Sequence, residues 1–220
     1  MTDHDARDTI ETDTQPKRAW RGAVADRSER FELKRQVVLR TAARIFSRYG
    51  FHQTTLVNIA NALHIAKPTL YHYFKNKDEI LLEIQQMAIS QITDVAQDAM
   101  PGDASGRKQL ETFVRRYVDM IIDDFGTCLI MIGATPLQPQ NRTVVRKGSK
   151  QIEKTMRQIL ATGAADKSLP PCDPKIAAMF LFGSLNWIPY WYRRDGALDP
   201  DGLKDRAVEF VLARLNAKEA

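Results

Sequence analysis

The chain has 220 residues, a formal net charge of +5 and 44% hydrophobic side chains, which is ordinary for a soluble globular protein of one or two domains. Its two cysteines, Cys128 and Cys172, are too few and too far apart for a disulfide framework or a Cys-x-x-Cys metal site, which favours a reduced, cytoplasmic setting. No run approaches the roughly 18 apolar residues of a membrane span, and the acidic N-terminus lacks the layout of a secretory signal. We expect no membrane partner, metal or cofactor.

The positive charge is concentrated in one part of the chain. Between Gln15 and Lys77 there are thirteen Lys or Arg residues against three acidic residues. Such a segment favours binding to a polyanion, with an affinity that falls as salt is added. A solvated basic face without a partner is the alternative.

Residues 1–26 are polar and lack hydrophobic periodicity, which predicts a disordered N-terminal arm. Its later part, residues 17–21, reads Lys-Arg-Ala-Trp-Arg. Basic arms that precede a helical DNA-binding domain can enter the adjacent minor groove, where narrow A·T tracts concentrate negative potential. An unstructured solubilising tail is the alternative.

A helix is predicted over residues 28–49, where Ser28 is a start signal and Gly50 suits a left-handed stop. Its arginines share one face because they are spaced by four residues. We expect some of them near a DNA backbone and the others in solvent; they are Arg40, Arg44 and Arg48.

The stretch 54–74 predicts two short helices joined by a tight turn. Apolar residues recur at three- and four-residue spacing after Thr55, a suitable N-cap, and Pro68 suits the first turn of the second helix. Two short helices cannot form a core alone, so they must rest on the helix before them. The outer face of the second then presents hydrogen-bond donors, as in a helix-turn-helix.

From Val37 to Glu83 the sequence resembles the DNA-binding domain of TetR-family repressors. The resemblance rests on the frame Phe46…Gly50…Thr55…Ile59-Ala60 and above all on Leu-Tyr-His-Tyr-Phe-Lys-Asn-Lys at residues 70–77. The turn reads Leu-His-Ile where the family usually has Ala-Gly-Val, so His64 is expected to adopt positive φ. The resemblance implies a DNA-binding domain over residues 27–77.

The resemblance also implies the DNA contacts. Thr55, Tyr73 and Lys77 match phosphate-contacting positions, and Lys67, Pro68, Thr69 and Tyr71 match positions that reach the major groove. A dimer would then read a near-palindromic operator in double-stranded DNA. For Tyr71 and Tyr73 the alternative is that they only close the small core.

The remainder, residues 78–220, has helical but no strand-like patterning, so the predicted fold is all-α with about nine helices: a three-helix head and a larger body for ligand binding and dimerisation. The predicted helix over residues 175–193 is apolar on almost every face and so must be buried on every face. With the last helix, residues 200–215, it would form a four-helix interface in a homodimer, as in TetR-like proteins.

Apolar and aromatic residues of the body are candidates for the wall of an effector pocket, with core packing as the alternative. They are Phe113, Tyr117, Met120, Met131, Met156, Met179, Phe182, Trp187 and Trp191. The segment 183–196 is similar to the NW…WYR…DG pattern of TetR-family regulators of fatty-acid, steroid and aromatic-acid degradation, several of which bind acyl-CoA. That similarity adds Asn186 and Tyr190 to the candidate effector residues. It also implies that Arg193 and Arg194 pair with the phosphates of the ligand. The alternative is that these arginines cap a helix.

The predicted function is therefore transcriptional repression by a dimer that a small-molecule effector releases from DNA through a population shift. The similarity of segment 183–196 suggests an acyl-CoA as this effector. One alternative is a regulator that responds to an apolar drug-like ligand, and another is a DNA-binding protein without an effector. A small hydrolase is a third, but no nucleophile, metal or phosphate-loop motif occurs. All four histidines lie in the arm or the head, so no catalytic residue is nominated.

Overall fold

The structure is a computed structural model that describes residues 15–99 and 102–216. These residues form ten helical segments, one of them only four residues long, and contain no strand, which confirms the all-α prediction with about nine helices. The chain divides into two compact units, one up to Val37 and one from Val38 onward. The helices are α1 (Gln15–Tyr49), α2 (Leu56–Ala62), α3 (Lys67–Tyr71), α4 (Lys77–Asp98), α5 (Gly106–Ile122), α6 (Asp124–Ile132), α7 (Pro139–Ala165), α8 (Pro174–Leu185), α9 (Ile188–Trp191) and α10 (Pro200–Asn216).

The first unit contains the beginning of α1. This helix starts at Gln15, so residues 15–26, which were expected to belong to a disordered arm, are helical in the structure. Pro16 suits the first turn of a helix, and the sequence that follows is rich in Arg, Ala, Glu and Lys, which are good helix formers. Residues 1–14 lie outside the described residues, and a role of the arm on DNA stays a prediction.

The second unit begins with the head, in which α2 and α3 pack on the later part of α1. Thr55 caps α2 as predicted: its side chain accepts from the Asn58 N–H at 3.2 Å, and the Asn58 side chain accepts from the Thr55 N–H at 2.8 Å. Gly50 and His64 both adopt positive φ, +83° and +53°, which confirms the two expected left-handed positions. The core of the head consists of Val38, Leu39, Ala42, Phe46, Phe51, Ile59, Leu70 and Phe74.

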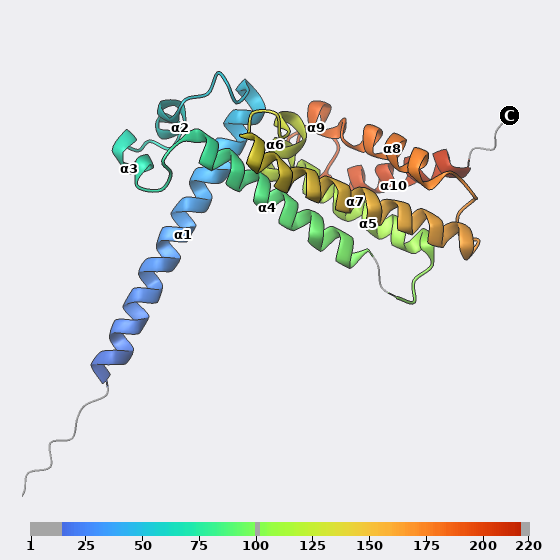
Figure 1. Ribbon diagram of the computed structural model, residues 1–220, viewed down its shortest axis with the longest axis horizontal. Helices are drawn as coiled ribbons and strands as arrows, with labels where there is room; N and C mark the ends of the chain where they lie inside the picture. Colours follow the sequence, from blue (N-terminus) through green and yellow to red (C-terminus); the bar gives the residue numbers. More distant parts are fainter. Residues whose placement is uncertain (1–14, 100–101, 217–220) are drawn as a thin grey trace, which may run out of the picture. The chain divides into compact units, whose positions relative to one another are not determined.

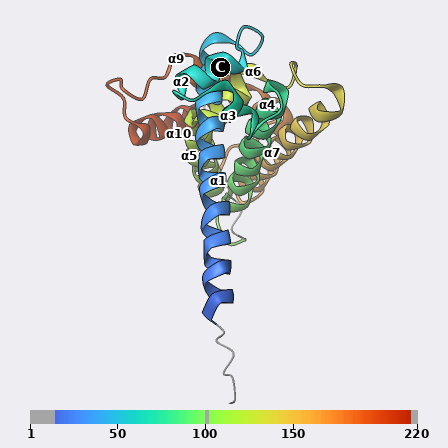
Figure 2. The same cartoon turned by 90° about the vertical axis from the view of Figure 1, so that its left-hand side faces the viewer.

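Long helices form the body, and each packs along its neighbours (Figure 1). α7 packs on both α4 and α5, and α10 covers the side of α5 away from α7 (Figure 2). At one end α5 and α7 touch backbone to backbone, because a Cβ on Gly106 would lie 2.1 Å from the Gly163 nitrogen. Glycine is therefore required at this crossing.

The prediction of one continuous helix over residues 175–193 is wrong, because the structure has two helices there, α8 and α9. The division follows from Pro189, whose ring would clash with the carbonyl of Leu185, four residues earlier, and which has no N–H to donate. Within the single chain one face of α8 is open, since Phe180 is 74% exposed, and its burial by a partner subunit stays a prediction. No helix in the described part of the chain is long and apolar enough to span a bilayer.

Candidate functional site

The face of α3 is the first candidate surface. Leu70 is the buried residue of this five-residue helix, and it anchors the helix on the core. The four residues predicted to reach the major groove are all exposed; they are Lys67, Pro68, Thr69 and Tyr71. The Lys67 ammonium lies 5.6 Å from the centre of the Tyr71 ring. The fold thus brings a cation, a hydroxyl and an aromatic ring onto one small projecting surface.

The three residues predicted to contact phosphates are placed differently. Thr55 is exposed at the start of α2, and Tyr73 is partly buried against the core. The Lys77 ammonium donates to three backbone carbonyls, those of Phe51 at 3.0 Å, His52 at 3.3 Å and Thr54 at 3.1 Å. These bonds use all three of its donors, so in this structure Lys77 ties α4 to the loop after α1 instead of facing a phosphate.

Two of the α1 arginines bind the junction between α5 and α6. Arg40 donates to Asp123 at 2.9 Å and lies 4.7 Å from the centre of the Phe125 ring, while Arg44 reaches Asp124 at 2.8 Å. Both arginines are exposed, as expected for a solvated face, but their ion pairs with the start of α6 were not predicted, and a contact with DNA stays a prediction. Their partners lie 80 or more positions away in the sequence, so helix spacing alone does not reveal them.

Asp123 also caps α6, because its carboxylate accepts from the backbone N–H of Phe125 at 3.2 Å. Burial acts to raise the pKa of this carboxyl group. The hydrogen bond from Arg40, the bond from the Phe125 backbone, the attraction to Arg40 and a bond from Gln91 outweigh burial and hold the pKa below its ordinary value. This carboxylate is ionised at neutral pH, so the head and the body are joined by charged contacts.

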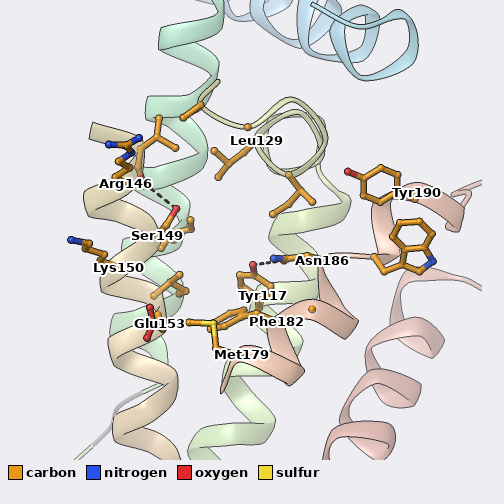
Figure 3. A pocket seen from close by; sticks show the side chains of 18 residues that line it. Tyr117, Leu129, Arg146, Ser149, Lys150, Glu153, Met179, Phe182, Asn186 and Tyr190 are labelled. Atoms are coloured by element: carbon orange, nitrogen blue, oxygen red, sulfur yellow. Dashed lines mark hydrogen bonds between the residues drawn. The ribbon is translucent and has the colours of Figure 1, made fainter. Parts of the chain in front are cut away.

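The body has a cavity of about 680 Å³, open to solvent at its edge, between α4, α5, α6, α7, α8 and α9 (Figure 3). At its inner wall the Tyr117 hydroxyl donates to Oδ1 of Asn186 at 2.7 Å. Burial raises the pKa of Tyr117 well above its ordinary value, although the Asn186 bond acts in the opposite direction, so the phenol stays neutral. Apolar side chains form most of the wall; they include Ile92, Leu129, Ile130, Val145, Ile152, Met179 and Phe182.

Six of the thirteen predicted effector residues line this cavity: Tyr117, Met179, Phe182, Asn186, Trp187 and Tyr190. Three others, Phe113, Met120 and Met156, are buried instead in the core. Phe113 stacks on Tyr117 with 5.7 Å between ring centroids, so it supports the cavity wall from behind.

The four remaining predicted effector residues lie elsewhere. Met131 and Arg193 line a separate cavity of about 600 Å³ beside α1, and Trp191 is half exposed. Arg194 donates to the Ile122 carbonyl at 3.3 Å from Nε and 3.1 Å from Nη2. Arg194 is thus tied to the end of α5, and neither arginine reaches the cavity that holds Tyr117.

Sequence reasoning missed the contribution of α7 to the cavity. This helix adds four polar side chains, Arg146, Ser149, Lys150 and Glu153, beside the apolar ones. The available signal was their spacing of three and four residues next to a buried apolar stripe. That spacing shows that they share a face, but it does not show that the face borders a cavity.

A second apolar surface is exposed on α8, α9 and α10. It consists of Ile176, Met179, Phe180, Trp187, Tyr190, Trp191 and Phe210, each at least 41% exposed. A groove of about 950 Å³ runs along this surface between α8 and the end of α10. Exposed apolar surface of this extent indicates an interaction site.

Comparison with known families places both parts of the chain. Residues 38–84 match the family described as "Bacterial regulatory proteins, tetR family", and residues 103–215 match the one described as "Tetracyclin repressor-like, C-terminal domain". The two matches coincide with the head and with most of the body.

Individual relatives are similar over most of the chain. The "Fatty acid metabolism regulator protein" of Bacillus subtilis is 21% identical over 82% of this chain and 95% of its own. The "HTH-type transcriptional activator FasR" of Mycolicibacterium smegmatis is 23% identical over 96% of each chain. The crystal structure of AibR in complex with isovaleryl coenzyme A and operator DNA shares the fold, with a TM-score of 0.68 at 22% identity over 81% of this chain and 97% of AibR.

The sequence resemblance, the fold and the family matches therefore agree: the chain belongs to the TetR family of bacterial regulatory proteins and is a transcription regulator, not an enzyme.

Proposed function

We propose that this regulator binds a palindromic operator as a homodimer through the exposed face of α3 and that a small-molecule effector, an acyl-CoA thioester, releases it from DNA. The single observation that carries the DNA-binding part is the exposure of Lys67, Pro68, Thr69 and Tyr71 around the buried Leu70. That arrangement leaves the outer side of α3 free to enter a major groove.

The chemistry of these side chains suits the edges of base pairs. A lysine such as Lys67 can donate to O6 and N7 of guanine, and the carbon atoms of Pro68 and Thr69 can contact a thymine methyl group. Thr55 and Tyr73 remain the proposed phosphate contacts, which set the register but carry no sequence information. Lys77 contributes by holding the loop after α1, not by contacting the backbone of the DNA.

Fluorescence anisotropy with a labelled duplex from the protein's own promoter region tests this. We expect K67A and T69A to weaken specific binding by about 1–3 kcal/mol each and to relax discrimination between base pairs. K154A is the matched control, because Lys154 is an exposed lysine in the middle of α7. Equal affinity of K67A and K154A for the specific duplex would contradict the assignment.

The proposed partner of the apolar surface on α8 to α10 is a second copy of the chain. Phe180 is the most exposed of its members, and nothing would lie within 4 Å of a Cβ on Gly183, one turn further along α8. A glycine with open space on a projecting helix face allows a partner helix to approach closely. Two copies of α8 and α10 would then bury each other's aromatic side chains.

Sedimentation velocity measures this assembly directly. We expect the wild-type protein to be a dimer and F180E to dissociate, because the charge would be buried without a partner. V144E is the control, since Val144 is a 38% exposed apolar residue on α7, outside the surface. A monomeric wild-type protein would contradict the dimer, and so would an F180E variant that stays dimeric.

The cavity between α4 and α9 is the proposed effector site. Its walls are mostly apolar, which suits an acyl chain, and the amide N–H groups of Asn186 have no protein acceptor in the described part of the chain, so they can donate to a carbonyl oxygen. Relatives named for fatty-acid metabolism and for a complex with isovaleryl coenzyme A support the same ligand class. Occupation of the cavity would favour a body arrangement in which α4 moves the head and the spacing of the two α3 helices is lost.

Titration of the protein–DNA complex with acyl-CoAs, free fatty acids and apolar drugs tests the effector. We expect acyl-CoAs to lower DNA affinity. Release by drugs but by no thioester would favour the drug-responsive alternative. A melting temperature that no ligand shifts would favour a DNA-binding protein without an effector.

A further inference from the structure

Two cationic side chains stand at the edge of the effector cavity. Arg146 and Lys150 are one turn apart on α7, both are exposed and both line the cavity. Figure 3 shows them on α7, across the cavity from Tyr190. Neither forms an ion pair or a side-chain hydrogen bond within residues 26–99 and 102–216, so both charges are available to an incoming anion.

We propose that Arg146 and Lys150 form the subsite that binds the phosphate groups of a phosphate-bearing effector whose acyl chain occupies the apolar part of the cavity. This inference rests on the proposed effector site and assigns the charged part of the ligand to named residues. An amphiphile of this kind matches a cavity that is apolar inside and cationic at its edge.

Arg193 and Arg194, to which the sequence resemblance assigned the binding of phosphates, form other contacts in the structure. Arg194 donates to the Ile122 carbonyl, and Arg193 donates to the Tyr192 carbonyl at 3.0 Å and lines the other cavity. A ligand seated beside Tyr117 would have to leave its cavity to meet either of them. Arg146 and Lys150 border the same space as Tyr117.

Glu153, the acidic residue of this cavity, lies one turn from Lys150 and two turns from Arg146 along α7. Its carboxylate forms an ion pair with Arg157 at 3.4 Å, which offsets its negative charge. Two further exposed lysines of α7, Lys147 and Lys154, add positive potential without lining the cavity. The balance of charge near this edge thus favours an anion over a neutral ligand.

A carboxylate could use one of these cations, whereas the several phosphate oxygens of coenzyme A can engage both, since residues i and i+4 of a helix lie side by side. The two ligand types are distinguished by comparing three compounds with the same chain: octanoyl-CoA, octanoyl-pantetheine and octanoate. Pantetheine keeps the thioester and removes the phosphates.

Isothermal titration calorimetry with the full-length protein provides the test. For the double variant R146Q/K150Q we expect octanoyl-CoA binding to weaken about tenfold or more, and octanoyl-pantetheine binding to change by less than about twofold. K147Q/K154Q, on the same helix and with the same change of net charge, should bind octanoyl-CoA nearly as the wild type does. All four positions are exposed, and equal melting temperatures of the variants will show that the fold is kept.

Each outcome has one meaning. Equal weakening by the two double variants would overturn the subsite, because net charge alone would then explain the effect. A wild-type preference for octanoate over octanoyl-CoA would overturn the phosphate assignment while keeping an acyl effector. Binding of none of the three compounds would overturn the proposed acyl effector itself, and the subsite with it.

Discussion

The head and the body of this regulator use their buried side chains in opposite ways. In the head, short helices place Phe46, Leu70 and Phe74 in one small core, the Thr55 cap begins α2, and the Lys77 ammonium holds the loop after α1. In the body, longer helices border an open cavity of about 680 Å³ beside the hydrogen-bonded pair Tyr117 and Asn186. A filled core has one arrangement, whereas helices that border a cavity have space to rearrange around a ligand.

The two regions meet at charged contacts. Arg40 and Arg44 of α1 bind the carboxylates at the start of α6, and α6 contributes Leu129 and Ile130 to the cavity wall. A change in the cavity that shifts α6 must therefore also act on α1. The difference between the two regions is consistent with the proposed function, in which the head keeps a fixed surface for DNA and the body responds to an effector. Four measurements examine this difference.

The largest expected effect is the loss of a core side chain from the head. F46A removes a ring that is fully buried and should lower the free energy of unfolding by about 3–5 kcal/mol. F182A removes a ring that already borders a cavity and should cost less, about 1–2 kcal/mol. Urea denaturation measures both. Similar losses would mean that the body is packed as tightly as the head.

The second effect concerns the ammonium that closes the loop after α1. K77M leaves three carbonyls without their donor and should destabilise the protein by about 1–2 kcal/mol. K75M is the control, because Lys75 is an exposed lysine two residues earlier, before α4 begins. Salt titrations of DNA binding add a second readout, the slope of the logarithm of the binding constant against the logarithm of the salt concentration. An unchanged slope in folded K77M supports the structural role of Lys77, and a slope reduced by about one unit, the value of one phosphate contact, contradicts it.

The ion pairs Arg40–Asp123 and Arg44–Asp124 should contribute less to the free energy of unfolding. D123N and D124N should each cost about 0.5–1 kcal/mol, because both pairs are partly open to solvent, whereas D94N on the exposed side of α4 should cost nothing measurable. Since the pKa of Asp123 is held below its ordinary value, its contribution is present at neutral pH and is lost as the pH falls below about 4. If the free energy of unfolding of D123N decreases with falling pH as steeply as that of the wild type, this assignment is contradicted.

The smallest effect is a difference between the two cysteines in their rate of alkylation, which leaves the stability of the protein unchanged. Burial raises the pKa of Cys128 to about 12, although a hydrogen bond with Ser47 acts in the opposite direction, and its side chain is fully buried. Cys172 is partly exposed. Iodoacetamide at pH 8 should therefore modify Cys172 first and Cys128 only after unfolding. Mass spectrometry of C172S provides the control, and rapid modification of Cys128 there would show that the junction opens.

Short-range patterns determined much of the head. The Thr55 cap, the positive φ of His64 and the exposed set from Lys67 to Tyr71 follow from spacing over a few residues, because helix starts, turns and single helix faces depend on neighbours in the sequence. The all-α fold and the family also followed from the sequence, since the motif of the head is long and specific.

Only the tertiary structure decided which side chains meet across the chain. Arg40 and Asp123 are 83 positions apart. The Lys77 ammonium donates to carbonyls more than twenty positions away. Arg146 and Lys150 line the edge of the cavity, although their helix has no aromatic residues that would have predicted this. Helical periodicity states which residues share a face but not which other helix that face meets. The lining of a cavity depends on how several helices pack together, and for that reason helical periodicity did not predict the lining of the proposed effector site.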